Sequence, residues 1–306
     1  MKPLALSTMY AQQERFADGA AFARYARDAG YQAIEISHST PMEKVERILE
    51  SAALPVTSVH QPAPWVRHSN GRGNSHCNLA ALDADERRAA IDYAAKSIDL
   101  CARIGATRLV VHLGHVGDVA EQFDEELQLR RMFDAGQFDA SRFEEIRETA
   151  IRQRRELAEP HLAQARDSLV ELVRRAECHG VTIGIENRYH YHEIPHPGEY
   201  EQVFEGLDPA QAGYWHDVGH AEVLHRLGFI DRHDWLAGWS SRCVGAHLHD
   251  VLGIGDHRAP GDGDVEWGYV VAGIRHLPAY TLEINQHQDD AAVRGAIGFL
   301  GEIGLR

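Results

Sequence analysis

Residues 171–187 read ELVRRAECHGVTIGIEN and contain a helical segment, a glycine and a strand, in that order. The segment before Gly180 has apolar residues at helical spacing, and Thr182–Asn187 is a short apolar run typical of a buried strand. A glycine directly after a helix ends it at little cost, because glycine readily adopts the left-handed conformation. Gly30 and Gly105 occupy the same position in two other segments. The chain therefore repeats a unit of helix, glycine and strand.

Short strands separated by helical segments are predicted along the whole chain. The predicted strands are Leu4–Ser7, Ala33–Ser37, Val56–His60, Leu109–Leu113, Thr182–Asn187, Gly213–Val218, Val244–Asp250 and Tyr280–Ile284. Strands that alternate with helices pair in parallel, and the two main solutions are a closed (β/α)8 barrel and an open doubly wound sheet. The open sheet needs a phosphate-binding glycine turn after an early strand, and the chain has none. We therefore predict an α/β fold, a single (β/α)8 TIM barrel spanning residues 1–306.

One segment interrupts this regular spacing. Residues 117–160 are rich in Glu, Asp, Arg and Gln, with a few large apolar residues scattered among them. We predict an extended helical insertion after the fourth strand, with a solvated surface. An active-site lid and a dimer arm are the alternative interpretations of this insertion.

The amino-acid composition excludes several classes of protein. Subtracting 46 acidic from 31 basic residues gives a formal net charge of -15, which repels the phosphate backbone that dominates nucleic-acid affinity. The four cysteines lie far apart, which argues against a disulfide framework or a thiolate zinc site and fits a reducing compartment. No stretch approaches the roughly 18 uninterrupted apolar residues that span a bilayer. We therefore expect a cytoplasmic protein with no membrane partner, for which nucleic acid is a disfavoured ligand.

The chain has a surplus of histidines, 20 in 306 residues, and their positions are informative. In a (β/α)8 barrel the active site lies at the carboxyl ends of the strands. Six consecutive predicted strands end in residues that can bind a metal, namely His60, His112, Glu186, Asp217, His247 with His249, and Glu283. Carboxylate oxygen and imidazole nitrogen without sulfur suit Mn²⁺, Co²⁺, Mg²⁺ or Zn²⁺. The sequence therefore predicts a divalent-metal site at one end of the barrel.

Each of these residues also has a simpler explanation when it is considered alone. Asp217 would serve as the N-cap of the next helix, and His60 and His112 would be hydrogen-bonded barrel histidines. Glu186 and Glu283 are harder to explain in this way, because each follows an apolar run where a carboxylate is costly without a compensating cation. Six such coincidences at one rim favour the metal site.

These residues resemble the xylose-isomerase-like TIM-barrel superfamily, which includes sugar isomerases and epimerases and the endonuclease IV apurinic-site nucleases. The resemblance covers nearly the whole chain and is weakest in residues 117–160. Its most specific motifs are GIEN at 184–187, HDVGH at 216–220, HLHD at 247–250 and DHRAPGDG at 256–263. It implies a one-metal core of Glu186, Asp217, His247 and Glu283.

The nuclease branch of this superfamily implies further ligands. They would form a second metal site from His60, His112, His220 and His257. The nuclease pattern has an aspartate two positions before the last of these histidines, but position 255 is Gly and the nearest carboxylate, Asp256, is displaced by one residue. This departure puts a complete three-metal site in question.

The resemblance also implies catalytic roles. Glu186 and Glu283 would be the acid and base on opposite faces of the sugar, assisted by His220. For the substrate we consider four further residues, Trp65 as an apolar wall of the cavity, His249 on the same strand face as His247, and His257 with Arg258 in the loop after strand seven. Packing and a solvent-exposed polar turn are the alternatives for Trp65 and for the loop.

The sequence thus favours a metal-dependent isomerase or epimerase of a sugar, sugar phosphate or inosose, acting by proton transfer through a metal-stabilised enediolate. The first alternative is an endonuclease IV-like phosphodiesterase with two or three zinc ions. Negative charge in the predicted rim loops 193–201 and 261–266 argues against it. The second alternative is a non-catalytic metal- or sugar-binding barrel. The expected partner is a small polyhydroxylated molecule, and homo-oligomerisation is left open.

Overall fold

The computed structural model describes residues 2–117, 123–136 and 139–306. In these residues eight parallel strands close into a barrel in the order β1-β10-β7-β6-β5-β4-β3-β2. The barrel strands are β1 (Leu4–Ser7), β2 (Ala33–Ile36), β3 (Val56–His60), β4 (Arg108–Val111), β5 (Thr182–Glu186), β6 (Ala212–Asp217), β7 (Cys243–Leu248) and β10 (Tyr280–Leu282). This closed barrel confirms the predicted fold class, and each predicted strand has its counterpart.

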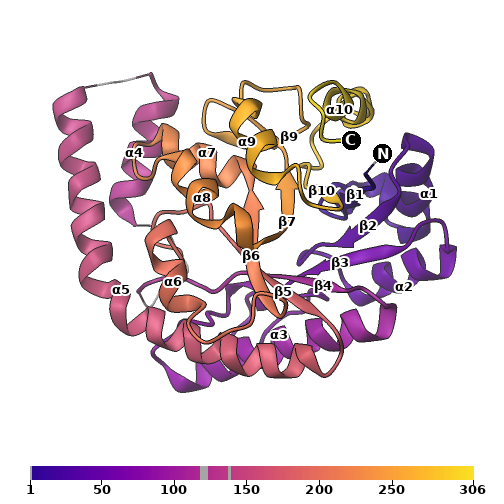
Figure 1. Cartoon of the computed structure of the whole chain (residues 1–306), viewed down its shortest axis with the longest axis horizontal. Helices are drawn as coiled ribbons and strands as arrows, with labels where there is room; N and C mark the ends of the chain where they lie inside the picture. Colours follow the sequence, from indigo (N-terminus) through magenta and orange to yellow (C-terminus); the bar gives the residue numbers. More distant parts are fainter. Residues whose placement is uncertain (1, 118–122, 137–138) are drawn as a thin grey trace.

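Helices surround the barrel on its outside (Figure 1). They are α1 (Gly19–Ala29), α2 (Met42–Ser51), α3 (Ala84–Ile104), α4 (Asp124–Asp134), α5 (Ala140–Glu177), α6 (Tyr200–Val203), α7 (Val218–Arg226), α8 (Arg232–Trp239), α9 (Trp267–Ile274) and α10 (Asp290–Glu302). The glycine that follows α1, Gly30, has a φ of 102°, and Gly105 after α3 has a φ of 75°. The predicted helix-ending glycines are therefore in the left-handed region. No helix in the described part of the chain is long and apolar enough to cross a bilayer.

The apolar core lies between the strands and the helices that cover them. On the α1 side, Phe22, Ala23 and Ala26 are fully buried at helical spacing. On the α10 side, Val293, Ala296 and Leu300 are buried in the same way. Helices α1 and α10 therefore each bury one apolar stripe against the barrel. Such burial is the usual source of stability for surface helices.

The predicted insertion and the structure differ in where the second helix ends. It is helical after β4, but residue 160 is not a helix boundary, because α5 runs through Pro160 and continues to Glu177. Figure 1 shows a bend along α5, and a proline inside a helix is a common cause of a kink. Part of the predicted insertion, 118–122 and 137–138, lies outside the described residues.

Helix α4 is anchored to the loop that follows β5, so it is more than a solvated helix. Its Glu126 is fully buried and accepts hydrogen bonds at 2.9 Å from the Tyr191 backbone N–H and from the His190 ring. Arg130 donates to the same carboxylate at 2.7 Å and to the Tyr189 carbonyl at 3.0 Å. Burial would raise the pKa of Glu126, but hydrogen bonds from neighbouring histidines and the charge of Arg130 hold its pKa below the ordinary value.

Replacing this carboxylate should release the insertion from the barrel. We expect Glu126→Gln to cost on the order of 3 kcal/mol locally, because it leaves the buried Arg130 charge without a carboxylate partner. Hydrogen exchange of 124–134 should become faster, whereas in Glu125→Gln, one residue earlier, it should not change. Since the pKa of Glu126 is depressed, the stabilisation is present at neutral pH and declines on acidification below about 4.3. Unchanged exchange in 124–134 would contradict this assignment.

Candidate metal centre

Four of the predicted residues meet at the carboxyl ends of the strands. Glu186 ends β5, Asp217 ends β6, His247 lies near the end of β7 and Glu283 follows β10. Asp217 and His247 are directly paired in the barrel register. One ligand atom from each of the four lies within 4.8 Å of the others, and all four residues are at most 1% exposed. The structure therefore brings the predicted one-metal group together.

His247 is held in one orientation by Glu35, a residue that the sequence analysis missed. The Nε2 atom of His247 lies 3.0 Å from Glu35 Oε1, and Ser58 donates to the other oxygen of Glu35 at 2.7 Å. This arrangement turns Nδ1 of His247 toward the other carboxylates, 2.6 Å from Glu186 Oε1 and 3.2 Å from Glu283 Oε2. A carboxylate on the second nitrogen is the usual support of a metal-binding histidine.

The charge of this cluster fits a divalent cation. Neutral imidazole has one N–H, yet both ring nitrogens of His247 lie within hydrogen-bond distance of carboxylates. Burial opposes a charge on this ring, but Glu283 and Glu35 raise its pKa well above the ordinary value. A metal ion beside Nδ1 would take the place of that second proton. The chemistry of the donors, three carboxylates and one imidazole, also fits the predicted Mn²⁺, Co²⁺, Mg²⁺ or Zn²⁺.

Arg188 contributes a permanent positive charge to the cluster and was also missed. Its guanidinium donates to Glu186, lies 2.7 Å from His112 Nε2 and pairs with Glu193 at 3.1 Å. Glu193 also accepts from the His190 backbone N–H at 2.8 Å. Both residues belong to the loop after β5, directly behind the GIEN motif, so the motif pointed to the correct loop but not to these side chains.

The four histidines predicted for a second metal site lie in two places in the structure. His60 and His112 gather with Glu186, their Nε2 atoms lying 3.7 and 2.9 Å from Glu186 Oε2. His220 and His257 instead group with His249. Among the described residues the four histidines thus lie in two groups, and metal binding by either group stays a prediction.

Asp256 joins the group that contains His220. Its Oδ2 atom lies 3.4 Å from His257 Nε2 and 3.9 Å from His220 Nε2, despite its displacement in the sequence. A hairpin that the sequence analysis did not predict, β8 (Asp250–Leu252) with β9 (Gly255–Arg258), brings it there. The hairpin also stacks the rings of His249 and His257, whose centroids are 4.2 Å apart.

The predicted substrate residues fall in different places. His249 reaches the centre, with Nε2 2.9 Å from Asp217 Oδ1, so it contacts a candidate ligand directly. Arg258 instead donates to the carbonyl and carboxylate of Asp262, both at 2.6 Å. Trp65 is 36% exposed in the loop after β3, and its backbone N–H donates to the Thr40 carbonyl at 2.9 Å. Arg258 and Trp65 are therefore held by contacts away from the four-residue group.

Asp217 combines the two interpretations given to it. One oxygen accepts the His220 backbone N–H at 2.7 Å and caps α7, and the same carboxylate belongs to the four-residue group.

Beside the centre, a cavity of about 120 Å³ is lined by His112, Arg188 and Glu193. The rest of its wall is Gln61, Pro62, Ser75, His76, Cys77, Gly114, His115, His190 and His192. This polar cavity could hold a small molecule next to the ligands.

A family model described as the xylose isomerase-like TIM barrel matches residues 23–303. The chain belongs to this family. Among the solved structures of the xylose isomerase-like fold, a D-tagatose 3-epimerase-like protein has a TM-score of 0.68 at 15% identity, covering 99% of this chain and 97% of that one. An L-ribulose 3-epimerase has a TM-score of 0.67 at 15% identity, covering 99% and 95%. The 3-keto-D-glucoside 4-epimerase YcjR of E. coli has a TM-score of 0.66 at 14% identity, covering 99% and 100%. At these identities the likeness shows the fold.

A curated relative, the uncharacterized protein y4fM of Sinorhizobium fredii, is 22% identical over 251 residues. The match covers 76% of this chain and 66% of that protein. The chain thus spans just under two thirds of the length of this relative.

Proposed function

We propose that this chain is a divalent-metal-dependent isomerase or epimerase of a small polyhydroxylated carbonyl compound, a sugar, sugar phosphate or inosose. The buried group of Glu186, Asp217, His247 and Glu283, with ligand atoms within 4.8 Å of one another, carries the proposal. The fold shared with solved sugar epimerases supports it. The four cysteines form no disulfide, which supports the proposal of a reducing, cytoplasmic compartment.

The four residues would hold the cation, which would supply positive charge that stabilises negative charge developing on substrate oxygens. Glu186 and Glu283 are both held ionised: burial raises their pKa, but the neighbouring histidines lower it well below the ordinary value. Each carboxylate can therefore accept a proton from carbon and return it. Because they come from β5 and from the segment after β10, they approach a bound molecule from different directions.

His220 is positioned to assist this proton transfer. Its Nδ1 lies 3.0 Å from the Asn187 carbonyl and donates to it, which leaves Nε2 as a proton acceptor. Burial lowers the pKa of His220, so the ring is neutral at neutral pH. We assign it to moving a proton on a substrate oxygen, while the polar cavity beside His112 holds the rest of the substrate.

Proton exchange in heavy water tests this function whatever product the reaction forms. The metal-loaded protein is mixed with ketoses, their phosphates and inososes, and deuterium at carbon is followed by NMR. We expect exchange at the carbon next to the carbonyl in at least one compound. Stoichiometric metal without exchange in any compound would instead favour the non-catalytic, ligand-binding interpretation.

A second candidate function, a multi-zinc phosphodiesterase, is favoured by the two additional ligand groups around His60 and His220. The formal net charge of -15 argues against a nucleic-acid substrate. For the isomerase we expect near one equivalent of metal after purification without added metal, against two or three zinc ions for the nuclease. Cleavage of an abasic-site duplex at physiological salt would overturn our first choice.

A further inference from the structure

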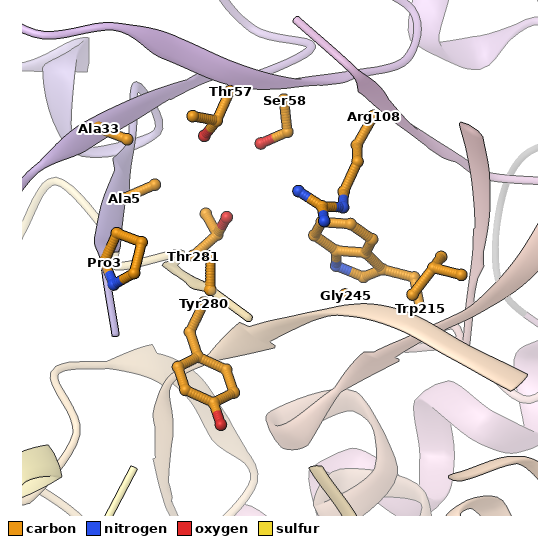
Figure 2. Close-up of a pocket in the computed structure, with 12 residues that line it drawn as sticks. Pro3, Ala5, Ala33, Thr57, Ser58, Arg108, Trp215, Gly245, Tyr280 and Thr281 are labelled. Atoms are coloured by element: carbon orange, nitrogen blue, oxygen red, sulfur yellow. The ribbon is translucent and has the colours of Figure 1, made fainter. Parts of the chain in front are cut away.

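A second cavity lies at the amino-terminal end of the barrel, opposite the candidate metal centre. Figure 2 shows it surrounded by residues at the starts of several strands, among them Ala5 of β1, Ala33 of β2 and Arg108 of β4. Its volume is about 60 Å³. One buried water needs roughly 10–15 Å³, so this space can hold a small molecule.

The cavity contains a positive charge without a carboxylate partner. Arg108 is the first residue of β4 and is partly buried. No ion pair or side-chain hydrogen bond joins its guanidinium to another residue in the described part of the chain. Burial lowers the pKa of Arg108, which reflects the cost of removing its charge from water.

A second polar group in the same cavity also lacks a partner. Trp215 is 3% exposed, and its indole N–H has no hydrogen-bond acceptor among the described residues. A buried indole N–H usually has one. Gly245 makes this position of the indole possible, since a Cβ there would lie 2.0 Å from Trp215 Cζ3.

Three apolar residues lie on the other side of the cavity, beside the hydroxyl side chains of Thr57, Ser58 and Thr281. Figure 2 shows Pro3, Ala5 and Ala33 across from Arg108 and Trp215. A ligand that matches both walls has one anionic head and a short hydrocarbon body. A carboxylate head also matches the two-pronged donor geometry of a guanidinium.

We propose that this cavity binds a short-chain monocarboxylate, with its carboxylate on Arg108 and the Trp215 indole N–H and its alkyl group against Ala5 and Ala33. The site is separate from the proposed sugar chemistry. Trp215 stands between the two, with its ring centroid 5.2 Å from that of His247 on the metal side.

Ligand-observed NMR titration of the full chain tests the proposal, using acetate, propionate and butyrate, with inorganic phosphate as the competing anion. We run it on metal-loaded protein and again after chelation, because the chelated metal centre is negative and does not attract anions. We expect saturable binding of one carboxylate per chain in both states. Arg108→Gln should weaken it at least tenfold, whereas Arg108→Lys should weaken it less and the exposed Arg155→Gln should leave it unchanged.

Ala33→Val tests the apolar side of the cavity without changing the charge of Arg108. It adds volume to the apolar wall and should weaken butyrate more than acetate. Absence of saturable binding, equal affinity in Arg108→Gln, or binding of phosphate but no carboxylate would each overturn the proposal. Sugar exchange should persist in Arg108→Gln, so a failure of this site is distinguishable from a failure of the proposed function.

Discussion

Replacing Glu283 by glutamine is expected to lower kcat for proton exchange on the sugar by about 10³-fold while the barrel stays folded. General acid–base catalysis contributes roughly 10²–10⁴-fold, and an amide cannot accept the proton that a carboxylate accepts. Glu283 is 1% exposed, and its two oxygens each lie 3.2 Å from a histidine nitrogen, of His60 and of His247. Glutamine has nearly the same shape, so these contacts should hold the side chain in place.

Because Glu283 is also a candidate ligand, the assay must separate loss of metal from loss of the base. Metal content is measured on each variant, and deuterium incorporation is followed at saturating metal. Glu302→Gln, on the exposed end of α10, is the matched control and should retain full exchange. A Glu283→Gln protein that binds metal and still exchanges at the normal rate would remove Glu283 as the base.

The barrel could be predicted from the sequence because local and global signals agree in it. Gly180, for example, marks the end of a helix and the start of β5 in the sequence, and in the structure it has a φ of 64° between those two elements. The functional residues at the strand ends could also be predicted, because a carboxylate such as Glu186 at the end of an apolar run is costly unless it is paired.

The continuous helix α5 could not be predicted, because Pro160 is a helix breaker in isolation. Buried contacts on both sides of it override this tendency. Ala158 and Leu162 pack in the core, and the ring of His161 lies 2.8 Å from the Ala80 carbonyl while accepting the Gly117 backbone N–H at 3.1 Å. Tertiary contacts of this kind leave no trace in local propensity.

The supporting residues of the metal centre were missed for a different reason. Glu35 lies within the apolar run AIEI of β2, where a carboxylate is as costly as at Glu186. It stands inside the strand, whereas the active site of a barrel is expected at the carboxyl ends of the strands. Arg188 and Asp256 become site residues through a loop and a hairpin, whose paths the sequence does not specify. Their role depends on distances between segments far apart in the chain.

Removing the metal with a chelator should abolish exchange and lower the melting temperature. A ligand that binds only the folded state stabilises it by about 2.7 kcal/mol at 100 times its Kd. Without a cation, the negative charge of the buried carboxylates Glu35, Glu186 and Glu283 is balanced only in part. The nearby positive charges are the Arg188 guanidinium and the second proton of His247. Added Mn²⁺ or Co²⁺ should restore both exchange and stability, and Mg²⁺ or Zn²⁺ are tested beside them.

The stability difference between the loaded and chelated protein should widen as pH rises. Glu283 and Glu35 raise the pKa of His247 against the effect of burial, so its proton stabilises the chelated protein fully below about pH 6.5. That contribution is lost as pH rises through the folded-state pKa, whereas metal affinity increases because fewer protons compete for the ligands. Melting curves at pH 6, 7, 8 and 9 measure both effects. A difference that stays constant or narrows with pH would show that no metal displaces a proton from His247.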